Sequence, residues 1–146
     1  MNIPDSIKQR DSYIERIKPF MRTPIIKVML GQQRVVKSYI FLQLMQLIKT
    51  EEPDAHIIYI NKEELEFAFI DSAISLNDYI LSQSRPDGWN YIFIEEIQYV
   101  PEFERALRSL FLNTKNDLYV TGNTKLMSGE LATYLTGRCI EWKIDN

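Results

Sequence analysis

A nearly continuous apolar run over residues 25–30 does most to limit how this chain can fold. A run of this kind, without polar alternation, is typical of a strand that is buried on both faces. The run ends at Gly31, and residues 37–49 then form a mostly apolar segment in which polar side chains recur only every three residues. That spacing predicts a core helix with a narrow exposed face. A buried strand that leads directly into a core helix indicates the beginning of a βαβ unit.

Four further segments have the composition of strands, and helical patterns separate them. The strands are expected over residues 57–60, 91–94, 118–120 and 139–144. Residues 101–111 have the apolar spacing of an amphipathic helix, and further helices are expected over residues 12–20, 71–82 and 129–135. Strands that alternate with helices predict an α/β fold with a parallel sheet. No repeat or linker interrupts the sequence, so we expect one domain over residues 1–146.

Composition limits the class of protein. The chain has 146 residues, of which 45% are hydrophobic, and a formal net charge of −3, so it can form a core without disulfides or a structural metal. One cysteine, Cys139, and one histidine, His56, exclude an internal disulfide and a zinc site; we expect them to be a packing residue and a residue at a strand entrance. No apolar run reaches the roughly 18–20 residues of a membrane-spanning helix, which favours a cytoplasmic protein with no membrane contact. Net charge leaves nucleic-acid binding open.

The junction between the first strand and the core helix carries the first chemical motif. Its residues are Gly31, Gln32, Gln33, Arg34, Val35, Val36, Lys37 and Ser38. The glycine and the Lys-Ser pair have the spacing of the phosphate-binding loop G-x-x-x-x-G-K-[ST], the Walker A motif. Val36 stands where that loop has its second glycine, and a β-branched side chain there adds bulk and disfavours positive φ. We therefore expect weakened nucleotide binding; an ordinary strand–loop–helix junction is the alternative.

An acidic pair follows the most hydrophobic strand. Glu95 and Glu96 come directly after residues 91–94. At the end of a strand, one carboxylate can hold magnesium and the next can orient the water that attacks the γ-phosphate, as in a Walker B motif. Glu95 is one methylene longer than the aspartate that is usual at the metal position. Two solvated glutamates in a turn are the alternative, but a phosphate loop upstream favours a magnesium–nucleotide site.

Together these segments resemble the prokaryotic AAA-type P-loop ATPases in which a P-loop domain precedes a C-terminal domain. The resemblance covers nearly the whole chain and includes Ile97 and Gln98 after the acidic pair, Thr121 and Gly122, and residues 128–138. It implies a three-layer P-loop NTPase fold with a five-stranded parallel sheet of order 5-1-4-3-2. It also implies ATP hydrolysis with Mg²⁺ as the cofactor.

The resemblance assigns roles to individual residues. Residues 31–38 would form the cofactor-binding loop, with Lys37 on the phosphates. Ser38 and Glu95 would serve the magnesium ion, and Glu96 would activate water. The chain departs from the family pattern in this site, with Val36 in place of glycine, Gln33 in place of arginine and Glu95 in place of aspartate.

Three more polar residues receive roles from the resemblance. Thr121, or Asn123 beside it, would be the polar sensor that follows the fourth strand. Arg138 would reach a nucleotide on a neighbouring subunit as an arginine finger, with a structural ion pair as the alternative.

Two functions remain open at this point: a Mg-dependent ATPase core with weak ATP binding and slow hydrolysis, and a non-hydrolysing interaction module on the same fold. A small P-loop kinase fits less well, because consecutive acids suit water activation and no arginine-rich lid segment follows. The chain ends after the fifth strand, so we expect the lid and the C-terminal domain to be absent. An apolar face would then be bare and pair with a second copy or another protein; closure of the core by the same side chains is the alternative. This face would contain Leu131, Tyr134, Leu135 and Trp142.

Overall fold

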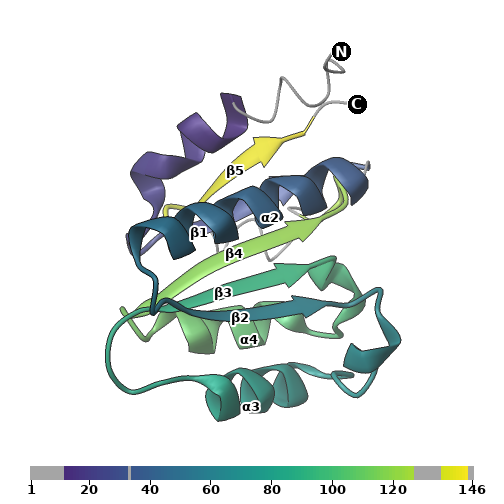
Figure 1. Ribbon diagram of the computed structural model, residues 1–146. Coiled ribbons are helices and arrows are strands. Elements are labelled where there is room, and N and C mark those ends of the chain that lie inside the picture. The colour runs from purple at the N-terminus through teal and green to yellow at the C-terminus, as the bar shows by residue number, and fades with distance from the viewer. Residues whose placement is uncertain (1–11, 33, 127–135, 145–146) are drawn as a thin grey trace.

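The computed structural model describes residues 12–32, 34–126 and 136–144 (Figure 1). It contains a five-stranded, fully parallel sheet of order β2-β3-β4-β1-β5, which is the predicted order read from the other edge. The strands are β1 (Ile26–Leu30), β2 (His56–Asn61), β3 (Asn90–Glu95), β4 (Asn116–Gly122) and β5 (Cys139–Lys143). The chain thus has the three-layer P-loop NTPase fold that the sequence predicted.

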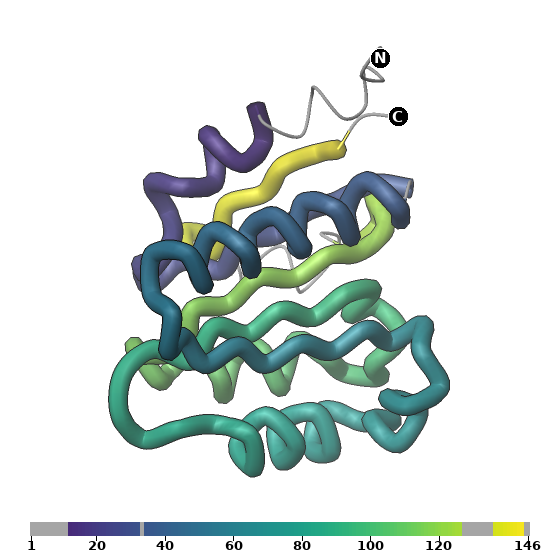
Figure 2. Tube along the Cα trace, viewed as in Figure 1, coloured from purple at the N-terminus to yellow at the C-terminus, as the bar shows by residue number. Residues whose placement is uncertain are grey.

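Helices cover both faces of the sheet. α2 (Arg34–Glu51) and the helical residues 12–17 lie on one face, and α3 (Ala73–Gln83) and α4 (Phe103–Phe111) lie on the other (Figure 1). Short 3-10 turns complete the described elements: η1 (Lys18–Phe20), η2 (Leu65–Phe67) and η3 (Ile97–Tyr99). The tube view shows how α2 carries the chain from β1, inside the sheet, to β2 at its edge (Figure 2). This crossover leaves room for β4 and β3 between them.

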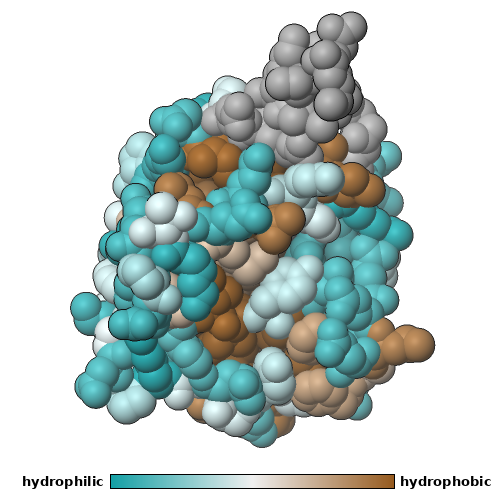
Figure 3. All heavy atoms as spheres, viewed as in Figure 1, coloured by the Kyte–Doolittle hydropathy of each residue, from teal (hydrophilic) through white to brown (hydrophobic). Residues whose placement is uncertain are grey.

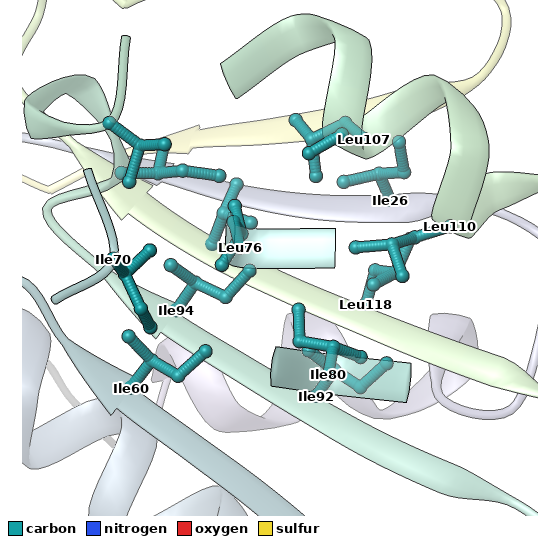
Figure 4. Close-up of a cluster of buried hydrophobic side chains, with 14 of the residues drawn as sticks. Ile26, Ile60, Ile70, Leu76, Ile80, Ile92, Ile94, Leu107, Leu110 and Leu118 are labelled. Carbon is teal, nitrogen blue, oxygen red and sulfur yellow. The ribbon is translucent and has the colours of Figure 1, made fainter. Parts of the chain in front are cut away.

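The two faces have separate hydrophobic cores. Against α3 and α4, the strands contribute mostly isoleucine, as Figure 4 shows for Ile26, Ile92 and Ile94. Against α2 the layer is more aromatic: the rings of Phe93 and Tyr119 stack with centroids 4.3 Å apart. Continuous burial of β1, β3 and β4 confirms that these are the central strands.

α2 differs from the prediction in two ways. It begins at Arg34, three residues earlier than the Lys37 expected from its polar spacing. Its exposed side also includes large apolar side chains: Val35, Tyr39 and Leu42 are 69%, 45% and 46% exposed. The face across which α2 runs accordingly mixes hydrophobic and hydrophilic atoms (Figure 3). The solvent-exposed stripe of this helix is therefore broader than the polar residues alone indicated.

The expected bare apolar face is not supported at Trp142. This side chain is 7% exposed and belongs to the core on the α2 face, where its ring meets Phe20 edge-on at 5.8 Å. Trp142 therefore closes the core, because β5 places it under residues 12–20. Leu131, Tyr134 and Leu135, and the helix predicted over residues 129–135, lie outside the described residues.

Candidate functional site

The carboxyl ends of β1, β3 and β4 meet at one edge of the sheet. The Gly31 N–H, just after β1, donates a hydrogen bond to the carbonyl of Gly122 at the end of β4, at 3.1 Å. A pocket of about 300 Å³ opens here, beside the first turn of α2. It is lined by Gly31, Gln32, Arg34, Lys37, Glu96, Gln98, Tyr99, Asn123, Thr124 and Lys125. In open α/β sheets, ligands bind in crevices at this position.

Lys37 has its ammonium group buried between three acceptors. Its Nζ donates to the Gly31 carbonyl at 2.7 Å, to Glu96 Oε1 at 2.7 Å and to the Gly122 carbonyl at 3.0 Å. The residue is 1% exposed. Since an ammonium group carries three protons, every donor of Lys37 has an acceptor. The lysine thus lies in the pocket wall, already engaged by its own chain.

Glu95 is held by two hydroxyl groups. The Ser38 hydroxyl donates to Oε1 at 2.5 Å, and the Tyr59 hydroxyl, from β2, donates to Oε2. Burial, and then the hydrogen bond with Glu95, raise the pKa of Tyr59 well above its usual value, so the phenol stays protonated and remains a donor. The carboxylate is itself buried, with 3% of the residue exposed. Ser38 and Glu95, both predicted to serve magnesium, are thus in direct contact with each other.

The oxygens of Ser38 and Glu95 fit a magnesium ion only if a phosphate supplies further ligands. Among the described residues, no group of three or more His, Cys, Asp and Glu side chains is placed to hold a metal ion. Magnesium, however, binds through one or two protein oxygens, water and substrate phosphates. The Ser38 hydroxyl and the Glu95 carboxylate supply protein oxygens of that kind.

Glu96 is fixed by its backbone and by both carboxylate oxygens. It has left-handed backbone angles, φ 56° and ψ 52°, and its N–H donates to Thr121 Oγ1 at 3.0 Å. Oε1 accepts from Lys37, and Oε2 accepts from Gln98 Nε2 at 2.6 Å. The side chain is 5% exposed. Glu96 therefore faces Lys37 and Gln98 rather than open solvent.

The structure places some residues of the predicted phosphate loop in the pocket wall and others elsewhere. Gly31, Gln32, Arg34 and Lys37 line the pocket. Val36 does not: it is 7% exposed and packs in the core on the α2 face. Its side chain thus lies in the core rather than in the pocket wall, because α2 already includes Arg34, and its φ is not positive. That Val36 weakens nucleotide binding stays a prediction.

The remaining predicted residues are not gathered around the pocket. Val35 points to solvent on the outside of α2, and Gln33 lies outside the described residues. Of the two sensor candidates, Asn123 lines the pocket, whereas Thr121 is fully buried and bonded to the Glu96 N–H. Arg138 precedes β5, and its carbonyl accepts from the Ile26 N–H at the amino end of β1. Arg138 therefore lies at the end of the strands opposite the pocket of its own chain.

Five residues of the site received no role from the sequence. Tyr59 binds Glu95, Gln98 binds Glu96, and the pocket is also lined by Tyr99, Thr124 and Lys125. Only Gln98 was signalled, as part of the block after the acidic pair. Arg34 reaches Tyr99 Oη at 3.4 Å and Glu63 at 2.7 Å, so the pocket wall is linked to the segment after β2. Away from the site, His56 begins β2 and Cys139 begins β5, as predicted.

With this geometry established, comparison with known proteins identifies the family. The family model described as "AAA domain" matches residues 23–145. This chain belongs to the AAA domain family. An uncharacterised protein of Haemophilus influenzae is 31% identical over 139 residues, which cover 92% of this chain and 34% of that protein. The chain thus spans about one third of the length of this relative.

Solved structures show the same fold at low sequence identity. AMPPCP-bound DnaA from Aquifex aeolicus has a TM-score of 0.60 at 12% identity, covering 99% of this chain and 48% of that one. A DNA polymerase III gamma subunit-related protein from Thermotoga maritima has a TM-score of 0.63 at 10% identity, covering 94% and 46%. A chain of Drosophila ORC bound to DNA reaches 0.62 at 9% identity, covering 99% and 94%. In the described part of the AAA domain, no helix is long and apolar enough to cross a bilayer.

Proposed function

We propose that this AAA domain binds Mg-ATP in the pocket at the carboxyl ends of β1, β3 and β4. One observation carries the proposal: the Ser38 hydroxyl contacts the Glu95 carboxylate at 2.5 Å, and Ser38 directly follows Lys37 in the first turns of α2. A hydroxyl and a strand-end carboxylate are the protein oxygens that serve magnesium in P-loop proteins. The N-terminus of the long helix α2 adds N–H groups and a positive dipole end.

The basic side chains around the pocket favour a polyphosphate ligand. Arg34, Lys37 and Lys125 all line it, and Arg34 has an exposed side chain. In the proposed complex, Lys37 contacts the outer phosphates, and Ser38 with Glu95 holds the magnesium ion, which neutralises phosphate charge when bound. Asn123 is the better placed of the two sensor candidates, because it faces the pocket. Tyr59 donates a hydrogen bond to the other carboxylate oxygen of Glu95.

Hydrolysis is proposed to be slow. Glu96 is the general base of this proposal, and a base must reach the attacking water. Both of its carboxylate oxygens are instead occupied by Lys37 and Gln98. This observation also favours the alternative function, a nucleotide-binding module that does not hydrolyse ATP.

Calorimetric titration with Mg-ATP tests the binding site. Because Lys37 is buried against Glu96, Lys37→Met is made in the Glu96→Gln background, which leaves no unpaired charge behind. We expect Glu96→Gln to bind and the double variant to lose binding by about a hundredfold, as expected when a charged partner of a phosphate is removed. Lys18→Met is the control, since Lys18 is exposed and pairs only with Glu15 in the described structure.

Phosphate release separates the two functions. Slow release by the unmodified protein that disappears in Glu96→Gln supports an ATPase. Binding without any release supports the non-hydrolysing module. If neither the unmodified protein nor Glu96→Gln binds Mg-ATP, the proposed function is wrong.

A further inference from the structure

The Lys37–Glu96 pair uses every donor of Lys37 and both carboxylate oxygens of Glu96. Lys37 uses its three protons on Glu96 and on the carbonyls of Gly31 and Gly122. Glu96 uses one oxygen for Lys37 and the other for Gln98. Both side chains are almost fully buried, 1% and 5% exposed. A phosphate that enters the pocket therefore meets no free donor on Lys37.

A phosphate thus competes for Lys37 with a carboxylate that is already in place. Two anions cannot both make the short contact that Glu96 makes, since Lys37 has no fourth proton. In a buried site, the attraction between Lys37 and Glu96 is also stronger than it would be in water. A phosphate reaches Lys37 only by displacing one of the lysine's three acceptors, and Glu96 is the one whose negative charge also repels the phosphate.

The paired arrangement has costs of its own. Glu96 occupies the left-handed region, where residues other than glycine are strained. The amide oxygen of Gln98 is buried and has no hydrogen-bond partner in the described structure. It lies against Gly122, where an added Cβ would come within 2.8 Å of it. A buried acceptor without a partner costs free energy, and this cost reduces the stability of the paired arrangement.

We propose that Glu96 acts as a built-in competitor of phosphate for Lys37, and that Gln98 is the positioning residue that holds it there. The proposal rests on the proposed function, because the phosphate is that of the nucleotide. In the empty pocket Gln98 binds the second oxygen of Glu96 and keeps the carboxylate on Lys37. Once a phosphate takes Lys37, the carboxylate leaves the pair and becomes free to face water. Binding of the nucleotide thereby releases the base.

Glu95 provides the contrast that makes the proposal specific. It is also a buried carboxylate at the same strand end, but its oxygens accept from Ser38 and Tyr59. None of the described hydrogen bonds joins it to Lys37. Loss of negative charge at Glu96 therefore frees the lysine, whereas loss of charge at Glu95 does not.

Calorimetric titration of the folded chain with Mg-ATP tests the competition. Glu96→Gln removes the competing charge at nearly constant volume, and we expect the Kd to fall by about tenfold, the effect of one hydrogen bond to a charged group. Glu95→Gln should bind no more tightly than the unmodified protein. Thermal unfolding of each variant shows that it is folded before titration.

Gln98→Met tests the positioning role. Methionine keeps the length of the side chain but donates nothing to Glu96, so the closed pair loses stability and the Kd should fall by about threefold, the lower range for a single hydrogen bond. Gln46→Met is the matched control: Gln46 is exposed on the outside of α2, so its variant should leave the Kd unchanged.

Each outcome decides one part of the proposal. Unmodified protein that binds Mg-ATP as tightly as Glu96→Gln would overturn the competition while leaving the ATP site standing. Tighter binding by Glu96→Gln but not by Gln98→Met would remove Gln98 from the mechanism. Absence of binding in both the unmodified protein and Glu96→Gln would overturn the ATP site, and the competition with it.

Discussion

The hydroxyl of Ser38 lies 2.5 Å from a carboxylate oxygen of Glu95, although 57 residues separate the two along the chain. The contact joins the first turns of α2 to the end of β3. It brings a hydroxyl and a carboxylate, the two protein oxygens that a magnesium–nucleotide site needs, to one point beside the pocket.

Ser38→Ala should make ATP binding less dependent on magnesium. Alanine removes one proposed metal ligand and leaves one Glu95 oxygen without its donor. We expect the Kd for ATP with magnesium to rise by about tenfold, toward the value measured with a chelator, in line with the 10- to 100-fold effects of metal-site partners. Titration with and without magnesium measures this. Ser82→Ala, on the exposed side of α3, is the control. An unchanged magnesium effect in Ser38→Ala would show that the ion does not use this hydroxyl.

Much of the fold was predictable because the strands are short apolar runs separated by helical patterns. The central strands β1, β3 and β4 are buried along their whole length, and that burial appears in the sequence as runs without polar alternation. The order of the strands required the family resemblance. Hydrophobic patterns identify elements, but they do not specify which strands are neighbours.

The beginning of α2 was not predictable from the motif. The phosphate-loop spacing treats residues up to Val36 as loop, whereas α2 already includes Arg34. No capping residue marks this start in the sequence, since Gln32 and Gln33 are poor N-caps. Burial of Val36 against the sheet is a tertiary effect that a local pattern does not contain.

The contacts of Tyr59 and Gln98 depend on the register of strands and on side-chain length. In the β2–β3 ladder, Asn61 is the partner of Glu95, so Tyr59 is two residues away along β2. The longer side chain of glutamate, compared with aspartate, helps Glu95 to meet the Tyr59 hydroxyl. Neither the register nor this reach can be derived from one sequence.

Glu52→Gln should remove an acid-sensitive part of the stability. The hydrogen bond from Tyr91, followed by the contacts with Arg85, lowers the pKa of Glu52 below its ordinary value of 4.5. The unfolded chain therefore takes up a proton at this site before the folded chain does, so its stabilising effect is present above pH 4.5 and is lost as the pH falls through the lowered pKa.

We expect Glu52→Gln to cost about 1 kcal/mol of unfolding free energy at neutral pH, and less at an acidic pH at which the Glu52 carboxyl of the folded chain is protonated. Urea denaturation at both pH values measures the difference. Tyr91→Phe removes the same hydrogen bond. It should therefore also reduce the difference in unfolding free energy between the two pH values. A Glu52→Gln cost that is equal at both pH values would contradict the assignment.

Gly31→Ala should destabilise the domain by crowding. An added Cβ at residue 31 would come within 2.9 Å of the Ile144 carbonyl oxygen, which belongs to the backbone and cannot turn aside. The Ile144 N–H also donates to the Leu30 carbonyl at 2.6 Å, so the segment is held close. We expect a loss of about 2 kcal/mol, as for other overpacked positions.

Gly137→Ala is the comparison for that variant. Gly137 has φ 78° and nothing within 4 Å of an added Cβ, so its cost comes from the backbone alone, about 1 kcal/mol. Urea denaturation of both variants measures the difference. Unchanged stability in Gly31→Ala would mean that the end of β5 moves away from β1 without cost.

Val36→Gly separates the role of this residue in the core from a role in the phosphate loop. If Val36 restricted the loop, glycine would tighten ATP binding at little cost to stability. The structure instead places the side chain in the core on the α2 face, in the same cluster as Ile40 and Leu44 of that helix. Removing it leaves a cavity, which costs about 2 kcal/mol for an aliphatic side chain, and glycine within a helix costs about 1 kcal/mol more.

Val35→Gly is the matched control, because the neighbouring Val35 lies on the same turn but is 69% exposed. It should lose only the helix contribution, about 1 kcal/mol. We therefore expect Val36→Gly to be less stable than Val35→Gly by about 2 kcal/mol in urea denaturation. Equal stability of the two variants, together with tighter ATP binding by Val36→Gly, would show that Val36 limits the phosphate loop after all.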